Sequence, residues 1–156
     1  MKLKSLVLPL ACSFILTGLK AQDTVADSLK LVKTFKELLT ICRTVDFADP
    51  KVKELGLFYK AAPYVIYQGE DKNREWKDFA NYKNEPERKG VDETCLRING
   101  TVNRDQSYKI EGYLTKNESE GIWHVLLISY LKKGVTKKMI FAFLKIGDRF
   151  GLGDID

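Results

Sequence analysis

The side chain best suited to acid–base chemistry at neutral pH is His124, the only histidine in the 156 residues. An unperturbed imidazole titrates at about pH 6.5, so His124 could act as a general base or as a pH switch. A catalytic base needs a partner that orients it, and the sequence indicates none. His124 stands beside the polar residues 118–121. We therefore favour a structural interpretation, in which His124 occupies the solvated beginning of a strand.

Metal binding and nucleophilic catalysis are not indicated by the other polar residues. Zinc sites combine Cys and His ligands at short, regular spacings, whereas this chain has one histidine, separated cysteines and scattered carboxylates. No serine lies in the glycine-flanked pattern of a nucleophile elbow. We predict no metal site, no cofactor and no catalytic residue.

Aromatic residues are frequent in the middle of the chain and could line a pocket for a flat, apolar ligand. Their more common role is in a hydrophobic core. If a pocket exists, we expect Tyr67, Trp76 and His124 to contact a small apolar ligand. The aromatic residues concerned are Tyr64, Tyr67, Trp76, Phe79, Tyr82, Tyr108 and Tyr113.

The first 21 residues have the pattern of a secretory signal peptide. Lys2 and Lys4 form a basic start, residues 6–19 are almost entirely apolar, and we expect cleavage after Ala21. The apolar run is too short for a membrane span, and lipidation of Cys12 is disfavoured because the run continues past it. The prediction is a secreted or periplasmic chain with no integral membrane span, whose residues 22–156 form a single domain.

Removal of this leader leaves a nearly neutral protein. The full chain has a net charge of +5, and the leader contains three lysines and no acidic residue, so the mature charge is +2. Charges of both signs are scattered along the chain, as on an ordinary solvated surface. This distribution predicts no nucleic-acid partner.

Two cysteines, Cys42 and Cys95, remain after processing. An oxidising compartment permits a disulfide between them. Each also lies among apolar residues at helical spacing, where a free cysteine packs as a small hydrophobic side chain. Both alternatives stay open, because the sequence does not test the geometry that a disulfide requires.

The last fifty residues predict an antiparallel meander, because four short apolar segments are separated by turn or charge signals. In the first segment Tyr108, Ile110 and Leu114 should share one face. The polar residues 116–121 predict a hairpin loop, and Gly147-Asp148 predicts a tight turn. The expected strands are 108–114, 122–131, 139–146 and a last strand that begins at Arg149.

The two central strands, 122–131 and 139–146, are apolar on both faces. A sheet with one solvated face would show polar residues at every second position, so both faces should be covered. The chain's own helices can cover one face, and a second copy of the chain is an economical cover for the other. We expect a homodimer through the outer face, with a strongly curled sheet as the alternative.

Helices are predicted from the earlier part of the chain. An amphipathic helix should span 27–45, because apolar residues recur every three to four positions. A second helix should begin with Asp49 as N-cap and Pro50 at its first position, bury Val52 and Leu55, and end before Pro63. The stripe of the first helix is Leu31, Phe35, Leu38, Cys42 and Val45.

Between these helices and the meander we expect a short strand, a helix and a charged connection, over 64–67, 73–82 and 83–90. Residues 91–102 fit two structures. Four apolar residues have helical spacing, whereas Asn99-Gly100 is typical of a hairpin turn. We favour the helix.

This order of elements resembles the nuclear-transport-factor-2-like superfamily over nearly all of the mature chain. Local similarity is carried by residues 64–69, Tyr-Val-Ile-Tyr-Gln-Gly, and by 141–150, Phe-Ala-Phe-Leu-Lys-Ile-Gly-Asp-Arg-Phe, which is similar to that family's last hairpin. The ending 151–156 is similar to small secreted bacterial members. The resemblance implies an α+β fold, the cystatin-like cone: a curved antiparallel sheet whose concave face is covered by N-terminal helices and forms a pocket.

Members of this superfamily include ketosteroid isomerases, scytalone dehydratase, polyketide cyclases and non-enzymatic transport or assembly subunits, so the fold does not decide the function. Its enzymes place an Asp base or an Asp–His pair in the cone. No such set matches here residue by residue, and no catalytic residue is carried over.

Two functions from different classes follow. The first is a secreted or periplasmic, non-enzymatic binding or interaction module that forms a homodimer. The alternative is a small isomerase-like or cyclase-like enzyme that acts on an apolar ligand in the cone. It would need His124 or a buried carboxylate facing a cavity.

Overall fold

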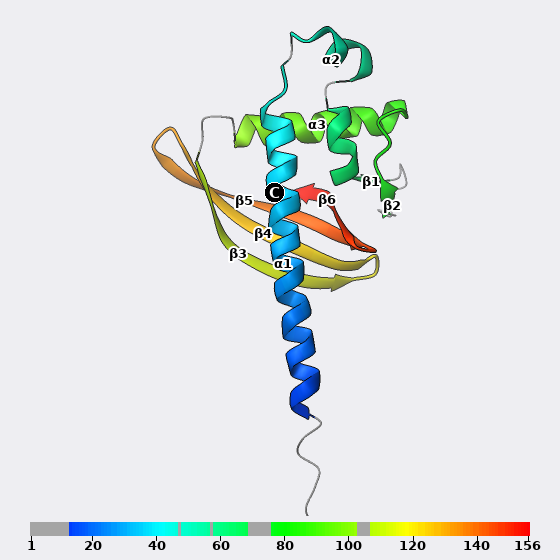
Figure 1. Cartoon of the computed structure of the whole chain (residues 1–156). Helices are drawn as coiled ribbons and strands as arrows, with labels where there is room; N and C mark the ends of the chain where they lie inside the picture. Colours follow the sequence, from blue (N-terminus) through cyan, green and yellow to red (C-terminus); the bar gives the residue numbers. More distant parts are fainter. Residues whose placement is uncertain (1–12, 47, 57, 69–75, 103–106) are drawn as a thin grey trace, which may run out of the picture.

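The computed structural model (Figure 1) describes residues 13–46, 48–56, 58–68, 76–102 and 107–156. In this part of the chain, helices pack on a four-stranded antiparallel sheet, and a pair of short strands lies beside it, so the chain is an α+β protein. The elements are α1 (Ser13–Arg43), α2 (Pro50–Leu55), the 3-10 helix η1 (Tyr59–Tyr64), β1 (Ile66–Gln68), β2 (Trp76–Phe79), α3 (Glu85–Thr101), β3 (Tyr108–Glu118), β4 (Gly121–Lys132), β5 (Val135–Ile146) and β6 (Arg149–Ile155).

The four-stranded sheet is a meander in the order β3-β4-β5-β6, as predicted. Its hairpins are tighter than expected, because β3 continues to Glu118 and β5 already begins at Val135. The hairpin loop predicted over 116–121 is present but shorter, with its turn at residues 119–120. Lys133 and Gly134 have φ angles of 52° and 77°, which is the left-handed pair of a two-residue hairpin turn.

A β-bulge exchanges the two faces of β3. The register shifts between Ile110 and Gly112, so that Glu111 is an extra residue in this strand. Beyond the bulge, Tyr113 joins the core and Leu114 lies exposed on the other side. The prediction that Leu114 shares a face with Ile110 is wrong for this reason.

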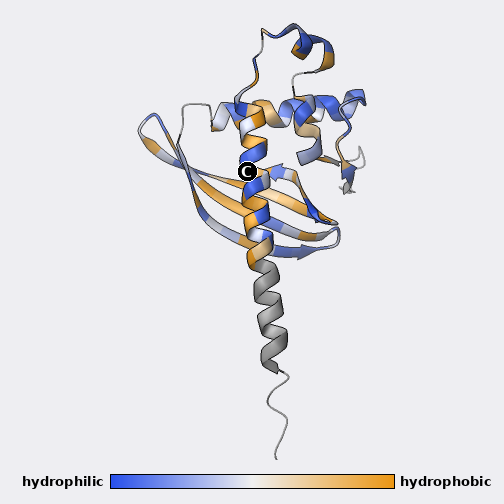
Figure 2. Cartoon of the chain, in the orientation of Figure 1, coloured by the Kyte–Doolittle hydropathy of each residue, from blue (hydrophilic) through white to orange (hydrophobic). Residues whose placement is uncertain are grey.

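α1 lies across one face of the sheet, called the inner face below (Figure 1). The predicted stripe is confirmed for Leu31, Phe35, Leu38 and Cys42, which are fully buried. Val45 lies beyond the end of the helix and is partly buried. The ring of Phe35 meets the ring of Phe141 edge to face, with centroids 4.8 Å apart. Hydrophobic residues gather where α1 crosses the sheet (Figure 2). Burial of each large apolar side chain there contributes about 1.5–3 kcal/mol to the stability of the folded chain.

α1 begins at Ser13, well before the predicted start near residue 27, and its first part extends past the sheet (Figure 1). Residues 13–21 of the expected leader are thus helical, and residues 1–12 lie outside the described residues. Among the described helices, none is long and apolar enough to cross a membrane.

α2 is shorter than predicted. Asp49 caps it as expected, since its carboxylate accepts a first-turn N–H at 2.9 Å. The helix ends at Gly56, whose φ of +87° favours glycine, whereas Pro63 lies inside η1. None of the α2 residues is buried, so the predicted burial of Val52 and Leu55 is wrong.

The predicted helix over 73–82 is also wrong. Its residues 76–79 form β2, which pairs antiparallel with β1 and places Phe79 opposite Ile66. The helical spacing of a few apolar residues is too short a signal to outweigh pairing with a strand formed elsewhere in the chain.

α3 begins inside the segment that we expected to be a charged connection, 83–90. Pro86 falls in its first turn, where proline fits because the first N–H groups of a helix have no intrahelical acceptor. The helix favoured over 91–102 is confirmed, and Val91, Cys95 and Ile98 form its buried side.

Candidate functional sites

His124 lies in the core, not at a solvated strand end. It is 2% exposed on the inner face of β4. Its Nδ1 lies 2.7 Å from Oη of Tyr113 on β3, and its ring meets the edge of Phe150 on β6 at 4.8 Å. The interpretation of His124 as a solvated residue is wrong because side chains of β3 and β6, Tyr113 and Phe150, cover its ring.

An ion pair stands near this imidazole. Asp27 of α1 accepts two hydrogen bonds from Nζ of Lys145 on β5, at 2.7 and 2.8 Å. Burial lowers the pKa of His124, an effect that Asp27 opposes and Lys145 reinforces. Burial likewise raises the pKa of the Tyr113 hydroxyl. His124 is therefore neutral at neutral pH, and its Nε2 is buried without a hydrogen-bond partner in the described part of the chain.

A buried neutral imidazole can accept a proton, but a base also needs a place for its substrate. His124 lines neither the cleft between α3 and β6 nor the two hollows beside α1 in the described part of the chain. The inner face next to it is filled, because Phe35 of α1 packs against both Phe141 and Phe143. The geometry gives His124 the environment of a base without the access that a substrate requires.

The expected ligand-binding set of Tyr67, Trp76 and His124 stays a prediction, because two of its side chains are not described. The backbones of Tyr67 and Trp76 lie in β1 and β2, and their side chains are outside the described residues. Ile66, the neighbour of Tyr67, packs with Leu144 on the outer face of the sheet. His124 lies on the opposite, inner face.

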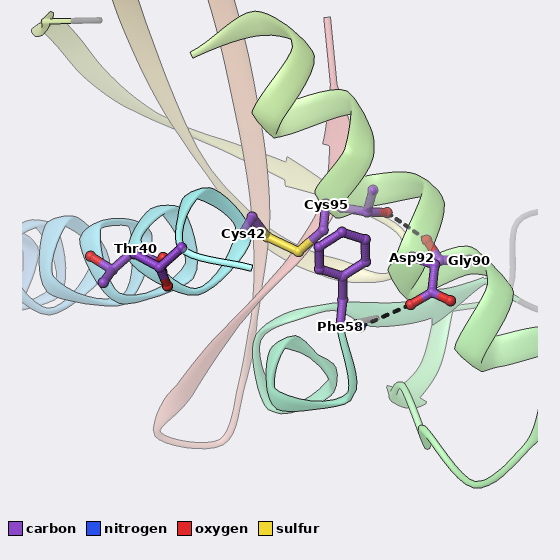
Figure 3. Close-up of a disulfide and its surroundings, with 8 residues drawn as sticks. Thr40, Cys42, Phe58, Gly90, Asp92 and Cys95 are labelled. Atoms are coloured by element: carbon purple, nitrogen blue, oxygen red, sulfur yellow. Dashed lines mark hydrogen bonds between the residues drawn. A yellow bond between two sulfur atoms is a disulfide. The ribbon is translucent and has the colours of Figure 1, made fainter. Parts of the chain in front are cut away.

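Cys42 and Cys95 form a disulfide that joins the last turn of α1 to the middle of α3 (Figure 3). Their Cα atoms are 4.9 Å apart, within the usual range for this bond. Both residues are fully buried. Beside them, the N–H of Phe58 donates to Asp92 on α3 at 3.1 Å. The bond and its neighbours fix the end of α1 against the helix that crosses it.

Among the described residues, the outer face of the sheet is covered at one end, over Trp123 of β4, Leu144 of β5 and Gly151 of β6. There, Ile66 of β1 packs on Leu144. Gly151 of β6 allows this contact, because an added Cβ would collide with Ile66 and come within 2.9 Å of Phe79. A side chain at this position would push β1 and β2 away from the sheet.

Toward β3 the outer face is apolar and exposed. Leu114 and Ile140 are 55% and 39% exposed, and Val125 and Leu127 lie partly exposed between them on β4. Leu114 pairs with Val125, and Leu127 pairs with Ile140, so the four side chains are neighbours. We call this group the open outer patch.

A further cleft of about 360 Å³ lies between α3 and β6. Its α3 wall includes Gly90 and charged residues, and its other wall is the end of β6. Sequence reasoning missed this cleft, although Gly90, a glycine inside a helix, is a signal that could have indicated it. The charged residues and glycines that line this cleft are Glu87, Gly90, Glu93, Arg97, Gly153 and Asp154.

Comparison with known proteins gives no relative. No family model, curated protein or solved structure matches the chain. Among the described residues, no group of three or more His, Cys, Asp or Glu side chains could hold a metal ion. The function must therefore be argued from the surfaces and the buried groups themselves.

Proposed function

We propose that this chain is a non-enzymatic binding or interaction module, secreted or periplasmic, that pairs with a second copy of itself through the open outer patch. The observation that supports this most is the contrast between the faces of one sheet. The inner face is filled by α1, whereas the outer face keeps exposed apolar side chains on adjacent strands. Such a patch on a soluble protein favours a protein partner.

Charge at the rim of the patch suits a two-fold interface. On β3, Lys109 lies 3.2 Å from Glu111, and Lys116 pairs with Glu118. A two-fold axis brings each patch against its own copy, so a rim that carries both signs can pair with itself without net repulsion.

Two features support a secreted or periplasmic location. The basic and apolar start of the chain is typical of a leader for export, and a buried disulfide persists in an oxidising environment. Within this proposal, the fold is a cystatin-like cone of the nuclear-transport-factor-2-like type. The order of helices, short strand pair, helix and meander supports it.

The alternative function, a small isomerase-like or cyclase-like enzyme, rests on His124. A buried, neutral imidazole with Asp27 near it is the type of group that proton transfer uses. The filled inner face favours the interaction module, because an apolar ligand would have to displace side chains of α1.

Native mass spectrometry of residues 22–156 with the disulfide intact tests these functions. We expect twice the monomer mass, and Leu114→Lys combined with Ile140→Lys should return the monomer. Leu96→Lys is the matched control, because Leu96 is 46% exposed on α3, away from the patch. A monomer at high protein concentration would contradict the dimer, and a reproducible small-molecule adduct would favour the enzyme or a ligand carrier.

A further inference from the structure

We propose that the cleft between α3 and the end of β6 binds an extended peptide segment containing lysine or arginine, which adds to β6 as a further strand. This site is separate from the open outer patch, and it does not depend on dimer formation. The proposal rests on three observations: an uncovered strand edge, open space in a helix wall, and an excess of acidic side chains.

The first observation is the edge of β6. This strand pairs with β5 on one side, and on its other side Val65 bridges to Leu152 in parallel. Asp156 exchanges both backbone hydrogen bonds with Ile140 of β5, so the N–H of Ile155 points away from β5. The edge beyond Leu152 therefore offers main-chain groups to an added strand.

Asp154 protects this edge while it is empty. Its Oδ1 accepts the N–H of Ile155 at 2.8 Å, and a charged side chain on an edge strand discourages unwanted pairing. A peptide carbonyl that takes this N–H would release the Asp154 carboxylate. The released carboxylate could then pair with a cation on the same peptide.

The second observation is Gly90 in the wall formed by α3. Glycine inside a helix costs about 1 kcal/mol relative to alanine. Apart from its chain neighbours and the backbone of its own helix, no heavy atom lies within 4 Å of the position that a Cβ would take there, so packing against other elements does not require the glycine. The missing side chain leaves room for a ligand backbone between α3 and β6, where Gly153 likewise adds no bulk.

The third observation is charge. Glu87, Glu93 and Asp154 outnumber Arg97 along the cleft, in a chain whose net charge is +5. In the described part of the chain, Glu87 and Asp154 each accept one backbone N–H, from Asn81 and Ile155, and neither forms an ion pair. Glu93 meets Lys89 only at 4.0 Å. These carboxylates favour a cationic ligand and repel phosphate groups.

The floor of the cleft fits the alternation of a strand. Val91, Leu152 and Ile155 close the floor of the cleft and are at most 3% exposed, while the acidic residues lie nearer to solvent. An extended segment directs successive side chains to opposite sides, so apolar and basic residues in alternation match both parts. The volume of about 360 Å³ suits a few residues of such a segment.

The test is an NMR titration of the ¹⁵N-labelled chain with acetylated and amidated Val-Lys-Val-Lys-Val. We expect shifts in the amide signals of Gly90, Gly153 and Ile155. The same peptide methylated on its central backbone nitrogen should bind about tenfold more weakly, since it lacks one strand-forming donor. A Val-Glu-Val-Glu-Val peptide should not bind.

Equal binding of the lysine and glutamate peptides would overturn the proposal. So would the absence of shifts in the cleft at about 1 mM peptide, which lies at the weak end of specific affinities. Equal binding of the methylated peptide would overturn strand addition.

A matched pair of variants locates the site. Gly90→Leu should reduce peptide affinity by about tenfold or more by filling the cleft. Gly100→Leu should leave it unchanged, because Gly100 lies in the same helix, has the same open space and does not line the cleft. Glu87→Gln combined with Glu93→Gln should weaken the lysine peptide without changing the helix. Equal losses for the two leucine variants would place the peptide elsewhere.

Discussion

The inner and outer faces of the sheet are built from similar apolar residues but have different covers. On the inner face, α1 places Phe35 against Phe141 and Phe143. On the outer face, the described side chains of β1 and β2 cover the end near β6, and Leu114 and Ile140 are exposed. In the described part of the chain, a long helix therefore covers one face, and a pair of short strands covers part of the other.

That difference separates two roles of the same residue types. Apolar side chains under α1 stabilise the folded monomer, whereas those of the open outer patch contribute little until a partner covers them. Substitutions on the two faces should therefore differ in the property that they change.

The largest expected effect is on the inner face. Phe35→Ala removes a fully buried ring that contacts several aromatic neighbours, and we expect a loss of about 3–5 kcal/mol in the free energy of unfolding. Urea denaturation followed by circular dichroism measures it. A loss below about 1 kcal/mol would mean that α1 does not form the main core.

Breaking the disulfide should lower the free energy of unfolding, because it frees the end of α1, which covers the inner face, from α3. The bond closes a loop with a sequence separation of 53 residues, for which chain entropy gives about 4 kcal/mol of stabilisation. Cys42→Ala, Cys95→Ala and the double variant should lose similar amounts in urea denaturation, since either substitution breaks the same bond. If the loss in the double variant equals the sum of the losses in the two single variants, this account is wrong.

The covered end of the outer face should tolerate no added side chain. Gly151→Ala forces a methyl group into Ile66, and we expect a loss of about 1–3 kcal/mol in thermal unfolding. Gly112→Ala in β3 is the control, because no atom lies within 4 Å of its Cβ position. If both variants lose the same amount, contact between β1 and the sheet does not explain the glycine.

His124 should make the inner face sensitive to acid. Its folded pKa lies below the unfolded value of about 6.5 because burial outweighs the attraction of Asp27. Below about pH 6.5 the imidazole takes up a proton in the unfolded chain more readily than in the folded chain, so the free energy of unfolding falls as the pH falls. Above this pH the contribution of the neutral His124 to stability is fully present. His124→Gln should show a weaker pH dependence of urea unfolding between about pH 5 and pH 7, whereas Tyr113→Phe, which keeps the imidazole, should retain it. Equal pH slopes for wild type and His124→Gln would contradict this.

The smallest effect on monomer stability should come from the open outer patch. Leu114 is 55% exposed, so Leu114→Ala should change the free energy of unfolding of the dilute monomer by less than about 0.5 kcal/mol. The same substitution should weaken self-association, measured by sedimentation velocity. A large loss of stability at low concentration would show that the patch is already covered within one chain.

Long, regular patterns predicted this fold well, and short ones did not. The stripe of α1, the strands of the meander and the helix over 91–102 follow directly from periodicity. β2 was missed because its identity depends on β1, and the exposure of Leu114 was missed because one bulged residue reverses the alternation. Gly112, a glycine inside the predicted strand, is the signal that could have indicated this bulge.

The candidate sites were harder to predict than the fold. His124 was identified by its residue type, but its burial depends on Tyr113 and Phe150, which reach it from two other strands. The cleft beside β6 combines a helix with a distant strand end, so no local spacing describes it. Contacts between distant segments decide such sites, and periodicity within one segment does not contain them.

The bond between Cys42 and Cys95 also decides what happens when a protease cuts the chain. Any single cut between residues 43 and 94 leaves two fragments that remain one covalent molecule, with α1 still tied to α3 and thereby to the whole meander. The segment containing α2, η1, β1 and β2 can therefore be nicked without loss of mass under non-reducing conditions. The inner face would thus keep its cover after a cut that would separate α1 from the sheet in an uncrosslinked chain.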